Sequence, residues 1–223
     1  MKQTKYNSMR TTLKILILLL AAPWAQATLT QVDTGGSIAA GSPVGAVFTA
    51  TLGGYTDGLN ANPTVSQLSV NLNITGGYNG NLYAYLIAPN GTLVVLMNQP
   101  GVAVNGFGAY GSGMNITLQD GLTGNGSIQS VTSGGILSGS YNAAGGSSAL
   151  SAFDGSQVNG VWTLYLADLA SGSGNPSLSW SIGLTPVPEP VDLALGLFAA
   201  MLLELAGLKW ICRPAVTSKS PEN

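Results

Sequence analysis

The stretch Gln67-Leu68-Ser69-Val70-Asn71-Leu72-Asn73-Ile74 alternates strictly between polar and apolar side chains. Successive side chains of a β-strand point to opposite faces of the sheet, so the apolar residues share one face and the polar residues share the other. Alternation over this length is typical of a strand that is buried on one face and solvated on the other. The stretch therefore predicts a half-buried strand.

Further strands are expected on both sides of this stretch. Short apolar or alternating runs between glycine-rich turns predict strands at residues 44–52, 82–87, 92–97, 114–118, 161–166 and 179–184. Pro89-Asn90-Gly91 predicts a tight hairpin turn, and no window between residues 28 and 185 has a helical period. The predicted fold class is all-β, an antiparallel jelly-roll-like β-sandwich over residues 65–185, preceded by an N-terminal strand and lead-in at residues 28–64.

Residues 121–160 differ from the rest, because they are rich in Gly, Ser, Ala and Asn with only scattered apolar residues. They predict a long surface excursion with one or two weak strands, near residues 127–131. Long loops on a sandwich can carry binding. We favour the alternative, that this segment only connects strands.

Residues 28–185 contain no Lys, Arg or His, and their only charged side chains are Asp33, Asp57, Asp120, Asp154 and Asp168. A surface without cations cannot neutralise phosphates, which excludes nucleic-acid binding. The domain also lacks an ordinary general base and a thiol nucleophile, since the only cysteine is at position 212. A Ser-His-Asp triad and a zinc site of the His/Cys type are therefore excluded, and we expect no enzyme, no catalytic residue and no bound cofactor.

The aspartates leave two kinds of site open. Asp154 and Asp168 could form a carboxylate pair for glycoside hydrolysis. We favour the alternative that each caps a turn, because Asp154-Gly155 is a turn dipeptide and Asp168 follows a predicted strand. With Asp120, these two residues are also the candidates for a calcium site built from oxygen ligands.

The aromatic residues leave a further choice. Tyr83 and Tyr85 share one face of the predicted strand at residues 82–87. They could stack on sugar rings or pair with residues on a neighbouring strand, and we favour the pairing. Trp162 and Trp180 alternate with polar residues and are expected in the core.

The N-terminus has the features of a secretory signal peptide over residues 1–27. Lys2, Lys5, Arg10 and Lys14 make the N-terminus positive, and an apolar segment at residues 13–22 overlaps the last of them. This segment is too short to span a bilayer, and Ala25 and Ala27 place small residues where signal peptidase recognises them. We expect signal peptidase to cleave before Thr28 and the protein to be exported; an uncleaved anchor is the alternative.

The C-terminus has the features of a sorting signal. A proline-rich hinge at residues 186–190 precedes an apolar segment at 191–208 that is long enough for a transmembrane helix. Lys209 and Arg213 then begin a basic tail at 209–223, which we expect to be cytoplasmic.

Pro188, Glu189 and Pro190, with the helix and basic residues after them, resemble the PEP-CTERM sorting signal of Gram-negative bacteria. The resemblance implies recognition by an exosortase, a membrane protease that cleaves near the motif. It also implies a transient membrane stage, followed by release into an exopolysaccharide-rich envelope or retention there. A permanent C-terminal anchor is the alternative.

Short motifs recur in a fixed order along the predicted sandwich. After the alternating strand come Gly77-Tyr78-Asn79-Gly80-Asn81-Leu82, Ala88-Pro89-Asn90-Gly91-Thr92, Asn159-Gly160-Val161-Trp162-Thr163-Leu164, Ala167-Asp168 and Leu178-Ser179-Trp180-Ser181-Ile182. In this order they are similar to the P domain of proprotein convertases, which also occurs in many bacterial secreted proteins. The resemblance implies a jelly-roll β-sandwich. Members often carry His and Asp where this chain has Gly77 and Asn81, so the hairpin offers calcium a neutral amide oxygen in place of a carboxylate.

These observations lead to one expected function and one alternative. We expect an exported, non-enzymatic protein of the cell envelope, outer surface or extracellular matrix of a Gram-negative bacterium, with a structural or interaction role and exopolysaccharide as a partner. The alternative is a calcium- or glycan-binding module of the P-domain type. A carboxylate-based hydrolase is disfavoured.

Overall fold

The computed structural model describes residues 28–33, 35–56, 62–124, 126–132 and 134–187, together with residues 198, 201 and 202. Residues 198, 201 and 202 are helical and exposed. Within this described part of the chain, no helix has the length and apolar character needed to cross a membrane. The predicted signal peptide at residues 1–27, the Pro188-Glu189-Pro190 motif and nearly all of the tail lie outside the described residues.

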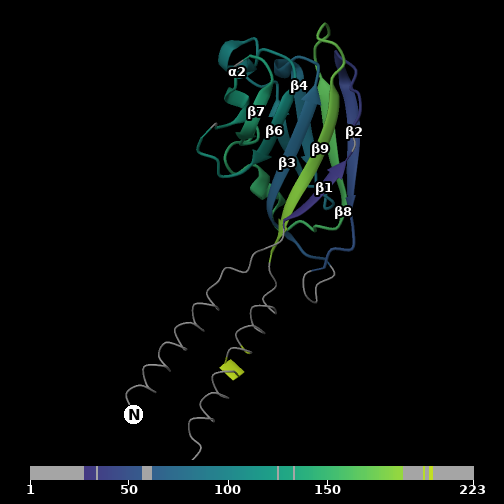
Figure 1. Cartoon of the computed structure of the whole chain (residues 1–223), viewed down its shortest axis with the longest axis vertical. Coiled ribbons are helices and arrows are strands. Elements are labelled where there is room, and N and C mark those ends of the chain that lie inside the picture. Colours follow the sequence, from purple (N-terminus) through teal and green to yellow (C-terminus); the bar gives the residue numbers. More distant parts are fainter. Residues whose placement is uncertain are drawn as a thin grey trace, which may run out of the picture. The chain divides into compact units, whose positions relative to one another are not determined.

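Residues Gln26–Val187 form one compact unit, a sandwich of two β-sheets (Figure 1). The five-stranded sheet has the order β1-β9-β3-β6-β7, and the four-stranded sheet has the order β2-β8-β4-β5. The strands are β1 (Leu29–Asp33), β2 (Ser42–Leu52), β3 (Val65–Thr75), β4 (Leu82–Ile87), β5 (Leu93–Asn98), β6 (Met114–Gln119), β7 (Leu137–Tyr141), β8 (Gly160–Asp168) and β9 (Ser177–Pro186). Short helical turns complete the unit: η1 (Asn79–Asn81), α2 (Val102–Asn105), η2 (Ile128–Ser130) and η3 (Leu150–Phe153).

The strand order confirms the predicted sandwich. With β7 set aside, β1-β9-β3-β6 facing β2-β8-β4-β5 is the order of an eight-stranded jelly roll. The pairings between these eight strands are all antiparallel. Strand β7 departs from the expectation of a purely antiparallel fold, because it pairs parallel to β6 at the edge of the five-stranded sheet.

The segment between β6 and β8 differs from the structure expected for it. The strand expected near residues 127–131 is wrong, because Ile128–Ser130 forms the 3₁₀ helix η2. The hydroxyl of Ser127 accepts a hydrogen bond from the amide of Gln129 at 3.2 Å and so favours a helical turn there. The strand of this segment is β7 instead. Helix α2 was not predicted because four residues are too few to show a helical period.

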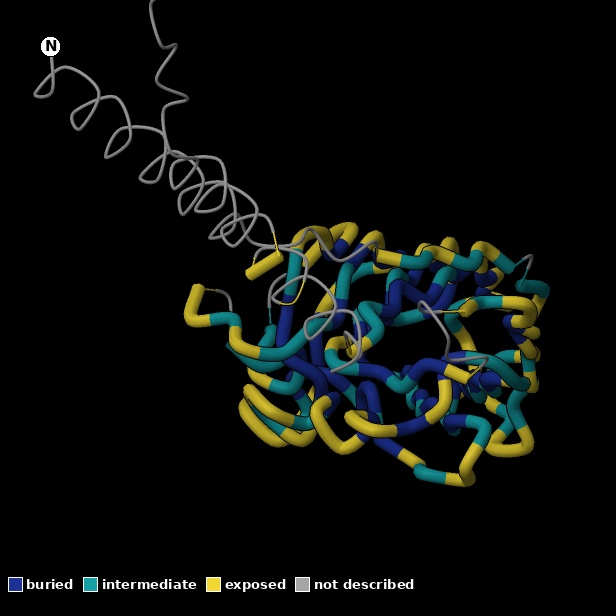
Figure 2. Tube along the Cα trace, turned by 90° about the horizontal axis from the view of Figure 1, so that it is seen from below, coloured by how far each residue is buried: buried dark blue, intermediate teal, exposed yellow. Residues whose placement is uncertain are grey.

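The core lies between the two sheets, and the alternation of β3 is as predicted. The apolar residues Leu68, Val70, Leu72 and Ile74 are buried there. Trp162 and Trp180 are buried too, as expected, and Trp162 donates a hydrogen bond from Nε1 to the carbonyl of Val158 at 3.1 Å. Figure 2 shows the buried positions along the inside of the sandwich and the exposed ones on its outer loops.

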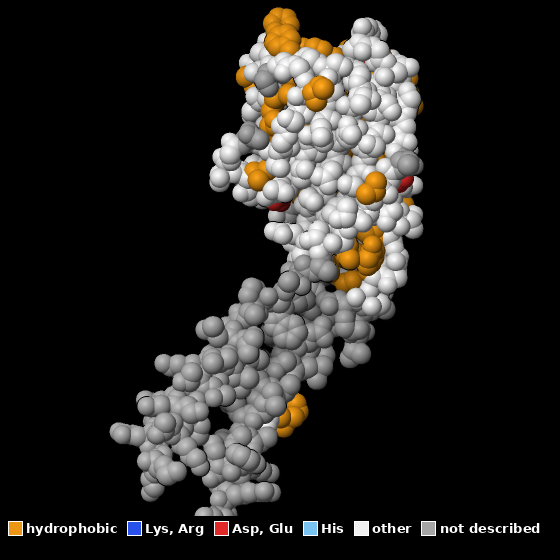
Figure 3. All heavy atoms as spheres, viewed as in Figure 1, with side chains coloured by type: hydrophobic (Ala, Val, Ile, Leu, Met, Phe, Trp, Pro, Cys, Tyr) orange, Lys and Arg blue, Asp and Glu red, His pale blue; other side chains and the backbone are white. Residues whose placement is uncertain are grey.

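The outward faces of the two sheets carry different side chains. The outward positions of β3, β6 and β9 carry a polar, uncharged face, which consists of Gln67, Ser69, Asn71, Asn73, Asn115, Thr117, Gln119, Ser179, Ser181 and Thr185. Val32 of β1, which pairs with Ser181, is an exposed apolar residue at the edge of this face. Figure 3 looks onto it and shows few hydrophobic side chains over β3 and β9. The outward positions of the four-stranded sheet form a tyrosine–valine face, which consists of Val47, Thr49, Thr51, Tyr83, Tyr85, Ile87, Leu93, Val95, Val161, Thr163 and Tyr165.

Candidate functional site

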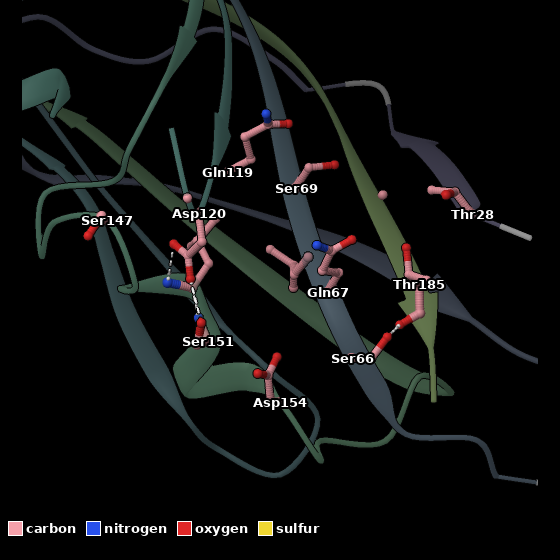
Figure 4. Close-up of a pocket in the computed structure, with 14 residues that line it drawn as sticks. Thr28, Ser66, Gln67, Ser69, Gln119, Asp120, Ser147, Ser151, Asp154 and Thr185 are labelled. Carbon is pink, nitrogen blue, oxygen red and sulfur yellow. Dashed lines mark hydrogen bonds between the residues drawn. The ribbon is translucent and has the colours of Figure 1, made fainter. Parts of the chain in front are cut away.

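A trough of about 590 Å³ opens on the polar face, at the end of the sandwich where β3 begins and β6 ends (Figure 4). Strands β3 and β9 form its floor. The end of β6 and the segment that leads into η3 form one wall, and Thr28 lies on the opposite side. The lining residues are Thr28, Ser66, Gln67, Leu68, Ser69, Gln119, Asp120, Gly121, Ser147, Leu150, Ser151, Asp154, Gly183 and Thr185.

Asp120 holds the wall of the trough together. Its Oδ1 accepts a hydrogen bond from the amide of Leu150 at 3.0 Å. Its Oδ2 accepts two from Ser151, from the amide at 2.6 Å and from the hydroxyl at 2.7 Å. These donors lie at the start of η3, so the carboxylate satisfies backbone N–H groups that the short helix leaves unpaired. Both oxygens of Asp120 are therefore committed to structure.

Asp154 is the free carboxylate of the trough. It follows η3 directly and is exposed, and no described residue donates a hydrogen bond to its side chain. The expectation that the Asp154 side chain caps a turn is therefore wrong. Partial burial raises the pKa of Asp154 because it removes water from the charged form, and the negative charge of Asp120 raises that pKa further. Asp154 can therefore accept hydrogen bonds from a ligand.

Gly183 keeps the floor of the trough open. A Cβ atom at this position of β9 would lie 2.7 Å from the hydroxyl oxygen of Ser69 on the neighbouring strand. Nearby, the hydroxyl of Ser66 donates to the carbonyl of Thr185 at 2.9 Å. Gln67 and Gln119 add amide groups, which can both donate and accept hydrogen bonds. The trough thus offers amides, hydroxyls and one free carboxylate, with no cation.

The structure separates the third predicted aspartate from the other two. Asp168 ends β8 and lies beside Gly77, which follows the far end of β3, whereas Gly155 donates its amide to Val65 at the near end. Asp154 and Asp168 are therefore at opposite ends of the sandwich and do not form a pair. No cluster of three or more His, Cys, Asp or Glu occurs among the described residues.

Asp168 is fully buried and caps its own turn, as the favoured interpretation expected. Its oxygens accept hydrogen bonds from the amide of Ala170 at 3.3 Å and from the hydroxyl of Ser173 at 3.2 Å. Gly77 contributes no side chain beside it. This end of the sandwich offers one carboxylate where calcium takes about six to eight oxygen ligands, so the residues present fit that ion poorly.

The predicted tyrosines lie on the tyrosine–valine face, away from the trough. Tyr85 faces Tyr165 across the strand pair, and their rings are stacked at 4.6 Å with an interplanar angle of 10°. Tyr83 meets both rings edge-on at 6.1 Å. The stack covers one face of Tyr85 and one face of Tyr165, so cross-strand pairing is confirmed.

The amides and hydroxyls that line the trough carry no distinctive signal in the sequence. The alternation of β3 predicts only that Gln67 and Ser69 are on its solvated side, and no pattern assigns a role to Gln119. Their shared polarity is visible in the sequence, but their meeting with Asp154 depends on contacts between distant segments. The predicted sorting residues Pro188, Glu189 and Pro190 and the signal-cleavage residues Ala25 and Ala27 lie outside the described residues.

Two solved structures of an Aeromonas sobria serine protease are similar to this chain. The complex with its chaperone (ORF2) is 15% identical, with 74% of this chain and 28% of that chain covered and a TM-score of 0.45. The protease alone is also 15% identical, with 76% and 29% covered and a TM-score of 0.42. The chain thus spans less than a third of the length of either structure.

Comparison with curated protein sequences finds no match. Residues 65–184, more than half of the chain, match the sequence profile of the proprotein convertase P-domain. This range begins with β3 and ends in β9, so it includes the floor and the wall of the trough. The chain therefore belongs to the proprotein convertase P-domain family.

Proposed function

We propose that this protein is an exported, non-catalytic module of the cell envelope or extracellular matrix, and that its trough binds a neutral polysaccharide. The observation that carries the proposal is the lining of the trough, where amides, hydroxyls and one free carboxylate open onto an uncharged polar face. Sugar hydroxyls both donate and accept hydrogen bonds, and these groups provide both partners. A volume of about 590 Å³ is typical of a site for a small ligand or for a few sugar rings.

The state of Asp120 supports a non-catalytic role. Hydrolysis of a glycosidic bond ordinarily uses two carboxyl groups, one as acid and the other as base or nucleophile. Both oxygens of Asp120 accept hydrogen bonds from Leu150 and Ser151, which leaves Asp154 as the one uncommitted carboxyl group of the trough.

Export and sorting are the second element of the proposal. We infer that signal peptidase removes residues 1–27 and that an exosortase-type protease acts at the Pro188-Glu189-Pro190 motif. Leu29 of β1 pairs with Leu184 of β9, so the first and last strands of the domain lie side by side (Figure 1). The two processed ends of the mature domain would then lie together at one end of the sandwich.

A mass spectrum of the mature protein tests this processing. The expected mass is that of a chain that begins at Thr28 and ends near Pro190. An intact C-terminus at Asn223 would contradict the sorting proposal and favour a permanent anchor.

Binding of oligosaccharides by the full chain tests the proposed ligand. The probes are cellohexaose, maltohexaose and dextran as neutral glycans and alginate as an anionic one, each titrated by calorimetry. We expect a neutral probe to bind and Asp154→Ala or Gln67→Ala to weaken binding at least tenfold. Thr49→Ala, an exposed change on the opposite sheet, is the matched control and should bind like the wild type. Equal binding by all variants, or binding of alginate alone, would contradict the proposal.

Calcium is the second candidate ligand, because the uncommitted carboxylate of Asp154 shares the trough with amide and hydroxyl oxygens. A ligand that binds only the folded state raises the melting temperature as its concentration exceeds the dissociation constant. A calcium site predicts such a rise between zero and 10 mM calcium, which Asp154→Ala would abolish. An unchanged melting temperature would exclude it.

A further inference from the structure

The tyrosine–valine face has an unusual composition for the outside of a β-sandwich. Val47, Val161 and Leu93 are 61%, 48% and 50% exposed, and the half-buried Ile87 and Val95 lie on the same face. None of the side chains that form this face is charged. The face therefore presents apolar and aromatic side chains, with Thr49, Thr51 and Thr163 among them, to the outside of the domain.

We propose that this face is a self-association surface on which a second copy of the chain packs, sheet against sheet. The proposal is independent of the polysaccharide site, which lies on the other sheet.

The contrast between the two sheets is the first argument. An antiparallel sheet with one solvated face normally alternates apolar-in and polar-out. Strands β3 and β6 of the five-stranded sheet follow this rule, and Val32 of β1 is an exposed apolar exception. The four-stranded sheet does not, because β4 places Leu82, Ala84 and Leu86 inward and Tyr83, Tyr85 and Ile87 outward. Large exposed apolar patches of this kind mark interaction sites.

The absence of charge from the face favours a second copy as the partner. Burying a charge in an interface costs free energy unless a partner group neutralises it. Two identical uncharged faces meet without such a cost and without repulsion between like charges. A two-fold axis brings the same patch of each copy together, which is the commonest arrangement of soluble oligomers.

The size of the face is sufficient for such a contact. Four strands about 4.8 Å apart give a width of roughly 19 Å, and strands of 6 to 9 residues at about 3.3 Å per residue give a length of roughly 20–30 Å. The flat footprint is then roughly 400–550 Å² on each copy. Two copies would bury about 1,000 Å², which is near the lower limit for a specific interface.

The aromatic part of the face is ordered in advance. Tyr85 and Tyr165 are stacked on each other, Tyr83 packs against both, and the hydroxyl of Tyr165 donates a hydrogen bond to the carbonyl of Pro43. Side chains that are already fixed lose little conformational freedom on association, so more of the burial contributes to affinity. Tyrosine also places its hydroxyl at the wet rim of an interface while its ring is buried.

Sedimentation of the full chain in a mild non-ionic detergent tests the proposal. The variants are Val161→Lys and Val47→Lys on the tyrosine–valine face, with Asn73→Lys and Ser179→Lys on the polar face as matched controls. All four positions are exposed, so each lysine is compatible with the folded monomer. We expect the wild type and both controls to form the same dimer. In Val161→Lys and in Val47→Lys, the dissociation constant of this dimer should be at least tenfold higher.

Two outcomes would overturn the proposal. One is a wild-type chain that remains monomeric at 100 µM. The other is a dimer that the valine variants leave unchanged, as association through the shared tail would give, or that all four lysines weaken equally, as a general effect of the added positive charge would give. Thermal melting of each variant verifies folding. If either valine variant unfolds, Thr49→Lys on the same face takes its place and the same expectation applies.

Discussion

Asp120 and Ser151 are 31 residues apart in the chain, yet Asp120 accepts two hydrogen bonds from Ser151, one from its amide and one from its hydroxyl. With the amide of Leu150, these contacts fix η3 against the end of β6. The carboxylate that borders the trough is therefore also the group that builds its wall. Because of this dual position, substitutions at Asp120 and Asp154 should have different consequences.

Asp120→Ala should lower the free energy of unfolding by about 1–2 kcal/mol, because it removes the acceptor of two backbone amides at the start of η3. Asp154→Ala should change it by less than about 0.5 kcal/mol, since Asp154 is exposed and makes no such bond. Urea unfolding of both variants measures the difference. Equal losses would mean that the contacts to η3 do not contribute to stability.

The pKa of Asp154 should make stability depend on pH in a defined direction. This pKa is higher in the folded state than in the unfolded chain, so protonated Asp154 favours folding. The contribution is complete below about pH 3.9 and is lost as the pH rises through the folded-state value. Asp154→Asn should therefore be more stable than the wild type at pH 7, by less than about 0.5 kcal/mol because the group is exposed.

Carbon-13 NMR titration of the aspartate carboxyls measures the same effect directly. The pKa of Asp154 should lie above the ordinary aspartate value and should fall in Asp120→Asn, which removes the neighbouring negative charge. An unchanged pKa in Asp120→Asn would show that desolvation alone causes the shift.

Much of the sandwich was predictable because its strands carry their own signal. In β3 and β4 every second side chain enters the core, so apolar residues recur at every second position of the sequence. In β7 the residues Leu-Ser-Gly-Ser-Tyr bury only the first and the last side chain. That strand is defined by its pairing with β6, a contact between distant segments that local periodicity cannot show.

The candidate site was less predictable for the same reason. The sequence identified Asp120, Asp154 and Asp168 as the scarce titratable groups of the domain, but it could not say which of them meet. The fold places Asp168 at the other end of β3 and brings Asp120 and Asp154 to one trough. The neutral groups beside them, such as Gln67 and Ser69, do not stand out in a chain so rich in amides and hydroxyls.

Two glycines with similar backbone angles should tolerate alanine very differently. Gly111 has φ +96°, and a Cβ there would lie 2.2 Å from the backbone nitrogen of Gly135. Gly121 has φ +76° with no atom within 4 Å of the same position. Gly121→Ala should cost about 1 kcal/mol, the strain of a left-handed backbone, whereas Gly111→Ala should cost about 3 kcal/mol or more because two backbone segments must also separate. Thermal melting compares the pair, and similar losses would contradict the close approach.

The floor of the trough offers a test of packing between neighbouring strands. Gly183→Ala places a methyl group 2.7 Å from the hydroxyl oxygen of Ser69, so that hydroxyl must rotate or the strands must shift. We expect a loss of about 1 kcal/mol. Ser69→Ala removes the obstructing oxygen, so the double variant should be more stable than the sum of the single changes predicts, by about 0.5 kcal/mol or more. Urea unfolding of the wild type, the two single variants and the double variant measures this double-mutant cycle. Additive losses would mean that Ser69 does not obstruct a side chain at position 183, which would remove the physical reason for a glycine in this floor.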